Sequence, residues 1–176
     1  AEDPQIDAVI QVITQADADV LVLQGFDYDL TGAALAAFAQ ALSDAGTQYP
    51  YRFAARPNTG LHTGLDMDGD GRLGDPRDAQ SYGRFSGQGG IAILSRYPIL
   101  LDAVQDFTDM LWRDLPGALL PETEDGPFPS AEAHTIQRLS TTAHWVVPID
   151  VPNFGPVSLL TFHASPPVFD GPEDRN

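Results

Sequence analysis

The sequence predicts an α/β layered domain, because helix-like and strand-like patterns alternate along its first third. Apolar residues recur with helical spacing over residues 4–18 and again over residues 31–42. Residues 20–23 form a continuous apolar run, as expected of a strand buried on both faces, and residues 51–55 are predicted as a second, short strand. Helix, strand, helix, strand is the order of a domain in which helices cover a sheet.

Both predicted helices carry start or stop signals. Asp3 is placed to cap the first helix, with Pro4 at its first position and its end near Ala18. Thr31 is placed to cap the second helix, and Gly46 lies just past its end. These signals separate the two helices from the strands that follow them.

Four further strands are predicted in the second half of the chain. Residues 90–95 and 99–104 are expected to form a hairpin through the three residues between them. Residues 142–151 and 157–163 are expected to form a final antiparallel pair, which turns through the Pro- and Gly-containing segment between them. The chain has no internal repeat, so we expect a single domain over residues 1–176.

Composition narrows the possible functions. The 176 residues are 43% apolar, enough for one domain with a core, and they contain no run long enough for a membrane span. All nine basic residues are Arg, and 25 acidic residues bring the net charge to −16. Such a surface repels a phosphate backbone, although adaptation to salty or extracellular water explains it equally well. The absence of Cys excludes disulfides, thiol catalysis and thiolate metal sites.

Residues 56–89 form a polar, Gly- and Asp-rich segment that is far longer than an ordinary connection. Within it, D-M-D-G-D-G-R-L-G-D matches the D-x-D-x-D-G start of a calcium loop, which gathers several oxygens around a hard cation. The predicted ligands are Asp66, Asp68, Asp70, the Arg72 carbonyl, and Asp75 or Asp78.

The calcium-type loop departs from its pattern at position twelve, where Arg77 replaces a bidentate Glu. Asp75 or Asp78 is expected to take the place of that ligand. The alternative is a solvated Asp-Gly turn that binds no ion. Because several carboxylates converge, the pattern favours Ca²⁺ over Mg²⁺ and a structural role, in which the ion closes a long loop of low apolar content.

Three segments resemble one known family. Residues 18–27 (ADVLVLQGFD), 90–99 (GIAILSRYPI) and 157–163 (VSLLTFH) are similar, in this order, to motifs of the endonuclease/exonuclease/phosphatase superfamily, in a bacterial branch with an inserted Asp-rich loop. The resemblance implies a deoxyribonuclease-like, four-layer α/β sandwich, in which two mixed β-sheets are flanked by helices. It also implies that the chain holds only part of that sandwich and is incomplete at both ends.

The same resemblance implies a metal-dependent phosphoesterase or phosphodiesterase, a nuclease- or phosphatase-like hydrolase that uses Mg²⁺ or Mn²⁺. His163 corresponds to the family's active-site His. The family's metal-binding Glu corresponds to Gly25, which has no side chain to ligate an ion. Asp27 lies two residues on, hence on the same side of a strand, and is the candidate replacement.

Three functional interpretations follow. The first is a phosphate-ester hydrolase whose missing strands are completed by another segment or chain. The second is a non-catalytic, calcium-stabilised, secreted binding or interaction module that kept the fold and lost the ligand at Gly25. The third is a calcium-binding surface or assembly protein with an architectural likeness only. The acidic surface and the calcium-type loop favour a secreted or periplasmic location.

Overall fold

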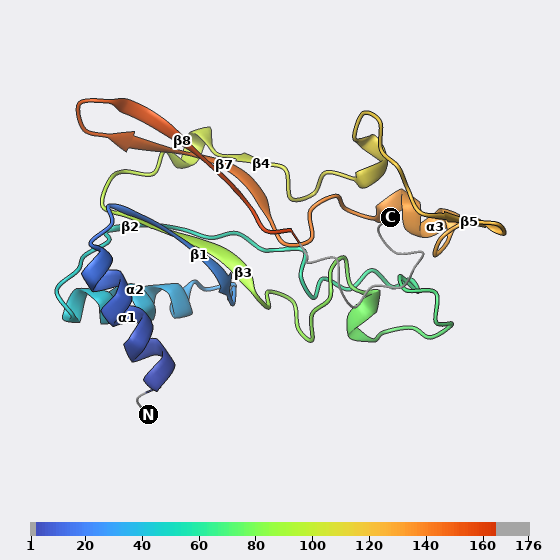
Figure 1. The fold of residues 1–176 in the computed structure, drawn as a ribbon, viewed down its shortest axis with the longest axis horizontal. Helices are drawn as coiled ribbons and strands as arrows, with labels where there is room; N and C mark the ends of the chain where they lie inside the picture. The colour runs from blue at the N-terminus through green and yellow to red at the C-terminus, as the bar shows by residue number, and fades with distance from the viewer. Residues whose placement is uncertain (1–2, 165–176) are drawn as a thin grey trace.

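The computed structural model describes residues 3–164, in which two β-sheets pack face to face and two helices cover the outer face of the first sheet (Figure 1). The first half of the chain contributes α1 (Pro4–Ala16), β1 (Val20–Phe26), α2 (Ala33–Asp44), β2 (Tyr51–Phe53) and β3 (Gly90–Ser95). The second half contributes β4 (Gln105–Asp106), β5 (Glu122–Thr123), β6 (Gly126–Pro127), α3 (Ala131–Ile136), β7 (His144–Val151) and β8 (Gly155–Phe162). Short 3-10 turns lie at Pro76–Asp78, Leu101–Ala103 and Trp112–Asp114.

The helices begin where polar side chains satisfy their first backbone N–H groups. Asp3 caps α1 as predicted. The cap of α2 is different from the predicted one: the carboxylate of Asp29, not Thr31, accepts the N–H groups of Ala33 and Ala34 at 3.0 and 2.9 Å. In residues 3–164, no helix has both the length and the apolar character needed to cross a membrane.

The first sheet has the order β1-β3-β2, and its central strand β3 is buried along its whole length. Ala92 and Leu94 face the helices, where Leu42 of α2 is fully buried against them. Ile91 and Ile93 alternate with them and face the other way. A strand buried on both faces must carry apolar residues throughout, which is the reason for its unbroken apolar sequence.

The second sheet has the order β4-β7-β8 and packs against the first through its buried face. Trp145 and Val147 of β7 pack with Ile91 and Ile93 of β3, and all four are almost completely buried. The rings of Trp145 and Phe53 meet edge to face at 5.0 Å, which joins the two sheets at β2. The result is a layer of helices, then a sheet, then a second sheet.

The predicted fold class, a partial deoxyribonuclease-like sandwich, is confirmed by this arrangement. Residues 3–164 hold three of the four layers: no helix in this range covers the outer face of the second sheet, where Leu160 and Phe162 are exposed. Every strand pair within the two sheets of the described range is antiparallel, so the expected mixed pairing is not present there.

The predicted hairpin between residues 90–95 and 99–104 is wrong. β3 ends at Ser95, and the next residues cross from the first sheet to the second instead of pairing with β3. Ile99 forms a single bridge with Ile149 of β7, and the chain then enters a 3-10 turn at Leu101–Ala103. Arg96 fixes this crossing by pairing with Asp17 and Asp19 beyond the end of α1.

The segment 56–89 and the later segment 107–142 form an irregular region beyond one end of the sandwich, on the right of Figure 1. Gln80 joins them, because its amide donates to the carbonyl of Ile136 at 2.8 Å and accepts the N–H of Arg138 at 2.9 Å. The side chain of Gln80 therefore links the two segments through hydrogen bonds to the backbone.

Candidate functional site

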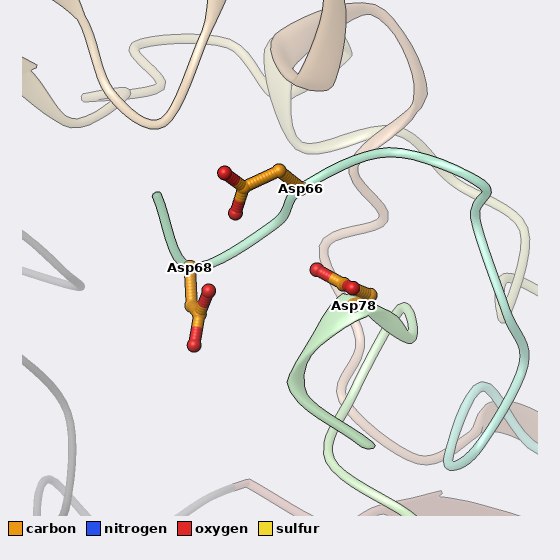
Figure 2. Close-up of side chains that lie close together, drawn as sticks. All are labelled: Asp66, Asp68 and Asp78. Atoms are coloured by element: carbon orange, nitrogen blue, oxygen red, sulfur yellow. The ribbon is translucent and has the colours of Figure 1, made fainter. Parts of the chain in front are cut away.

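The Asp-rich loop brings its carboxylates together as the sequence predicts. Figure 2 shows Asp66 and Asp68 on one stretch of the loop and Asp78 on the turn that faces it. One carboxylate oxygen from each of these three residues lies within 4.8 Å of the other two. A second group, which shares Asp68, meets the same limit with Asp70 and Asp75. Five predicted side-chain ligands are therefore gathered in two overlapping groups.

Backbone N–H groups hold two of these carboxylates in place. Asp66 accepts the N–H groups of Gly69 and Gly71 at 2.7 and 2.8 Å. Asp78, only 2% exposed, accepts the N–H of Met67 at 3.0 Å and that of Gly74 at 2.5 Å. The buried carboxylate of Asp78 thus ties the start of the loop to its end, as a buried charge requires.

The loop is seated against the later irregular segment through Gly69. A Cβ atom at Gly69 would lie 2.8 Å from the ring of Phe128, and the backbone there has a φ of 75°, in the left-handed region. Both constraints favour glycine at this position. The loop is therefore packed against the rest of the protein at Gly69.

Arg77, which stands where a calcium loop has its bidentate Glu, places its guanidinium 3.4 Å from the Asp68 carboxylate. Its side chain is 61% exposed, so this ion pair is weak in water. Arg72 is exposed, and its N–H donates to Asp70 at 2.8 Å. The replacement at position twelve therefore adds a positive charge beside the cluster without closing it.

The loop gives neighbouring carboxyl groups opposite pKa shifts. Burial raises the pKa of Asp68, and the negative charges of Asp70 and Asp75 raise it further. Burial also opposes ionisation of Asp66, but the N–H groups of Gly71 and Gly69 outweigh it and lower the pKa of that carboxyl. Mutual repulsion of this kind is relieved by a bound cation, so the donor set fits a hard divalent ion.

The second group of predicted residues lies at one end of the sandwich, next to the irregular region. His163 follows β8 directly and is half-buried. Its backbone carbonyl accepts the hydroxyl of Thr141 at 2.8 Å. The carbonyl of Phe162, the residue before it, accepts the side-chain amide of Gln24 from β1 at 3.2 Å. β1 and β8, the edge strands of the two sheets, therefore meet at His163.

Asp27 follows the end of β1 and is exposed, and one of its oxygens accepts the N–H of Gly89 at 2.7 Å. A hollow of about 400 Å³ opens beside it, between the end of β1, the start of α2 and Arg52. Metal-ligating side chains within residues 3–164 gather in threes only in the Asp66–Asp78 loop. Asp27 by itself therefore does not make a divalent-cation site in the described part of the chain.

Hydrogen bonds connect the neighbourhood of Asp27 with that of His163. The N–H of Tyr28 donates to the carbonyl of Gly87, whose own N–H donates to the carbonyl of Thr59, at 2.7 and 3.1 Å. The hydroxyl of Thr59 lies 3.4 Å from the carbonyl of Thr141, which in turn holds His163. One end of the segment 56–89 therefore lies near Asp27, and the other is linked to His163 through Thr141.

Gly25 is accommodated by a backbone that suits no other residue well. Its φ is 76°, and the register between β1 and β3 shifts between Gln24 and Phe26, which marks a β-bulge. A Cβ atom there would meet nothing within 4 Å, so space is present and only the backbone conformation is restrictive. The glycine at this position is thus coupled to the local shape of the strand.

Sequence reasoning missed the buried residue that organises this end of the molecule. Asn58 is fully buried, and its amide donates to the carbonyls of Thr108 and Ser140 at 2.8 and 2.6 Å. Its side-chain oxygen accepts a hydrogen bond from Arg138 at 2.6 Å, and Arg138 also pairs with Asp109. The partners lie 50 to 82 positions away in the sequence, so no local pattern could have indicated them.

Comparison with known proteins assigns the chain to a family. Among solved structures, it is similar to an endonuclease/exonuclease/phosphatase from Beutenbergia cavernae DSM 12333, with 18% sequence identity and a TM-score of 0.47. That alignment covers 93% of this chain and 33% of the other, so the chain spans about a third of that protein's length. Comparison with curated proteins gives no match. The model of the Endonuclease/Exonuclease/phosphatase family matches residues 1–170, and the chain therefore belongs to this family.

Proposed function

We propose that the protein is a divalent-metal-dependent phosphoesterase and that His163 acts at its reaction centre. Family membership supports the reaction class. The observation that carries the proposal for this chain is the position of His163. It is half-buried at the end of β8, where Gln24 of β1 bonds to Phe162 and where Thr141, which contacts Thr59 of the segment 56–89, bonds to His163. A His in such a place can exchange a proton with a phosphate oxygen or with an attacking water.

The chemistry divides between the cation and the chain. Mg²⁺ or Mn²⁺, when bound, polarises a phosphoryl oxygen and offsets the charge that develops on it. Asp27 is the carboxylate nearest in sequence to the family's ligand position, and its exposed side chain leaves it accessible to an ion. Because Asp27 is a single carboxylate, the contribution of the chain that this structure supports is the placement of His163 at the end of β8.

We also propose that the Asp66–Asp78 loop binds Ca²⁺ and that the ion is structural. The two overlapping carboxylate groups and the raised pKa of Asp68, caused by burial and by its acidic neighbours, support a cation there. The loop approaches Phe128 of the later irregular segment at Gly69, which supports a role in holding this region together. Extracellular calcium would keep such a site filled, and for this reason we retain export as a proposal.

A non-catalytic, calcium-stabilised binding module is the second candidate. The backbone at Gly25 supports it, because a positive φ within a β-bulge disfavours any side chain at the position where the family has its metal-binding Glu. This alternative predicts calcium-dependent stability without turnover. The two candidates share a fold and differ only in chemistry, so an activity assay separates them.

We also propose a substrate class and a partner for the open edge of β8. A phosphate ester is the substrate, and the net charge of −16 favours small esters over long nucleic acids. Within residues 3–164, β8 pairs with β7 alone, and Leu160 and Phe162 stand exposed on its outer face. An open edge of eight residues with apolar neighbours supports pairing with a further segment or another chain.

Hydrolysis by the full-length gene product tests the proposal. Bis-p-nitrophenyl phosphate and short DNA are incubated with Mg²⁺ or Mn²⁺, and parallel reactions contain a chelator in excess. The proposal predicts turnover that requires the cation and returns when the cation is added back. Correctly folded protein that shows calcium-dependent melting but no turnover with any of these substrates and cations would instead support the binding module.

A further inference from the structure

We propose that Thr141 and Gln24 are positioning residues, which fix the backbone that carries His163 and thereby orient its imidazole. The inference rests on the proposed function, since it concerns the same reaction centre. It adds two residues that neither family membership nor sequence pattern indicates. The supporting observation is that successive carbonyls, those of Phe162 and His163, are each held by a side chain from a different element.

The hydroxyl of Thr141 takes the place of a backbone hydrogen bond that the sheet does not supply at His163. The last residue pair between β7 and β8 is His144 with Phe162, and His163 lies one residue beyond it. The backbone that precedes β7 has left the extended path, so no strand partner continues the ladder there. The hydroxyl of Thr141 supplies the donor instead and reaches the carbonyl of His163 at 2.8 Å. Without this bond, the first residue after the strand would be free to fray.

Gln24 acts from the other sheet. Its side-chain amide donates to the carbonyl of Phe162 at 3.2 Å, across 138 positions of sequence. The carbonyl of His144 accepts the N–H of Phe107, so the backbone groups of His144 point toward β4 and not toward β8. His144 and Phe162 are therefore a pair without mutual hydrogen bonds, and the backbone groups of Phe162 point to the open edge of β8. Gln24 therefore fixes the edge of β8 at its last residue and ties it to β1.

The two bonds act on the peptide groups on either side of one residue. Because Phe162 and His163 are held from different directions, the backbone dihedrals of His163 are restricted, and with them the directions that its ring can take. Thr141 is itself tied to the segment 56–89 through the hydroxyl of Thr59, at 3.4 Å. A general acid or base loses about a hundredfold in rate when it is displaced by roughly 1 Å, so this support bears directly on turnover.

Kinetics of matched variants in the full-length protein test the inference. Thr141→Val removes the hydroxyl at nearly constant shape, Thr141→Ser retains it, and Gln24→Met removes the amide at similar length. Thr135→Val and Gln40→Met are the controls, because both side chains are exposed and donate local hydrogen bonds within helices. Thr135 donates to the carbonyl of Glu132 and Gln40 to the carboxylate of Asp44. Initial rates give kcat and KM, and NMR of the ring nitrogens reports the environment of His163.

The inference predicts that kcat falls about tenfold or more in Thr141→Val and in Gln24→Met, with KM within about twofold of the wild type. Thr141→Ser and both controls keep the wild-type kcat. The ring signals of His163 shift or broaden in the first two variants only.

Two results would overturn the inference: wild-type kcat in both Thr141→Val and Gln24→Met, or unchanged His163 ring signals in both. If Thr141→Val does not fold, the comparison of Gln24→Met with Gln40→Met decides the question. Inactivity of the wild-type protein would count against the proposed function and not against positioning, because the NMR signals of His163 test positioning without turnover.

Discussion

A single partly exposed carboxylate illustrates how one residue can organise a helix end. Asp29 lies four positions before the first residue of α2, and its two oxygens accept the N–H groups of Thr31, Ala33 and Ala34. The hydroxyl of Thr31 is the largest cause that lowers the pKa of Asp29 from 3.8 to about 2, followed by the N–H groups of Ala34 and Ala33. Gly32, with a φ of 68°, turns the chain so that this carboxylate reaches the helix.

This lowered pKa makes a prediction about acid stability. Because the folded-state pKa lies below the unfolded one, Asp29 stabilises the fold fully above about pH 4, and this contribution is lost as the pH falls toward 2. Asp29→Asn should therefore lower the melting temperature at pH 7, and its difference from the wild type should shrink below pH 4 and close near pH 2. Melting curves between pH 2 and 7 measure this. Asp125→Asn, in an exposed turn, is the control; a difference for Asp29→Asn that stays constant down to pH 2 would contradict the assignment.

At the scale of the element, the segment 56–89 depends on polar groups for its shape. Its one regular piece is the 3-10 turn Pro76–Asp78, which Asp75 and Asp78 cap reciprocally. Pro57, Met67 and Ala79 are its few buried apolar side chains, so hydrophobic burial contributes little. Carboxylates that repel one another are instead held close by backbone N–H groups. A cation in this loop would convert that repulsion into attraction.

Removal of calcium should therefore destabilise the protein. At a calcium concentration about a hundredfold above Kd, binding contributes about 2.7 kcal/mol. For a domain of this size that corresponds to a rise in melting temperature of roughly 5–10 °C. Melting curves with calcium and with a chelator measure the rise, and Asp66→Asn or Asp68→Asn should abolish most of it.

The control for the calcium loop is Asp125→Asn, which removes the same charge from an exposed turn outside the loop. It should retain the full response to calcium. An equal response in Asp68→Asn and in the wild type would mean that the ion, if any, binds elsewhere. Replacement of calcium by magnesium should give a smaller rise, because a cluster of several carboxylates suits the larger ion.

At the scale of the whole molecule, local patterns in the sequence determine which parts could be predicted. The strand at β3 and the Asp repeat of the loop each lie within about ten residues, and both were predicted correctly, as a strand and as a converging set of carboxylates. The prediction that residues 20–23 are buried on both faces is wrong, because they belong to β1, an edge strand in which Val22 is exposed. The crossing after Ser95 was mistaken for a hairpin, because a short apolar run beyond a turn has the same pattern whether it pairs backwards or enters another sheet.

The candidate site was harder to predict, because its supports come from distant segments. His163 could be named because the strand that ends at it resembles a family motif, whereas Thr141 and Gln24, which hold its backbone, are ordinary residues whose role depends on contacts across 22 and 138 positions. The same is true of Asn58, which is buried and bonds to Arg138, 80 positions away. The catalytic roles of His163 and Asp27 and the ligand roles in the Asp loop stay predictions until they are measured.

The effect of His163→Ala on hydrolysis by the full-length protein tests the central claim most directly. The account predicts that kcat for bis-p-nitrophenyl phosphate with Mg²⁺ or Mn²⁺ falls by roughly 10²–10⁴-fold, while the melting temperature stays close to that of the wild type. His62→Ala, at an exposed position in the long segment, should leave kcat within about twofold. Metal-dependent turnover that is equal in His163→Ala and in the wild type would contradict the claim that the end of β8 is the reaction centre.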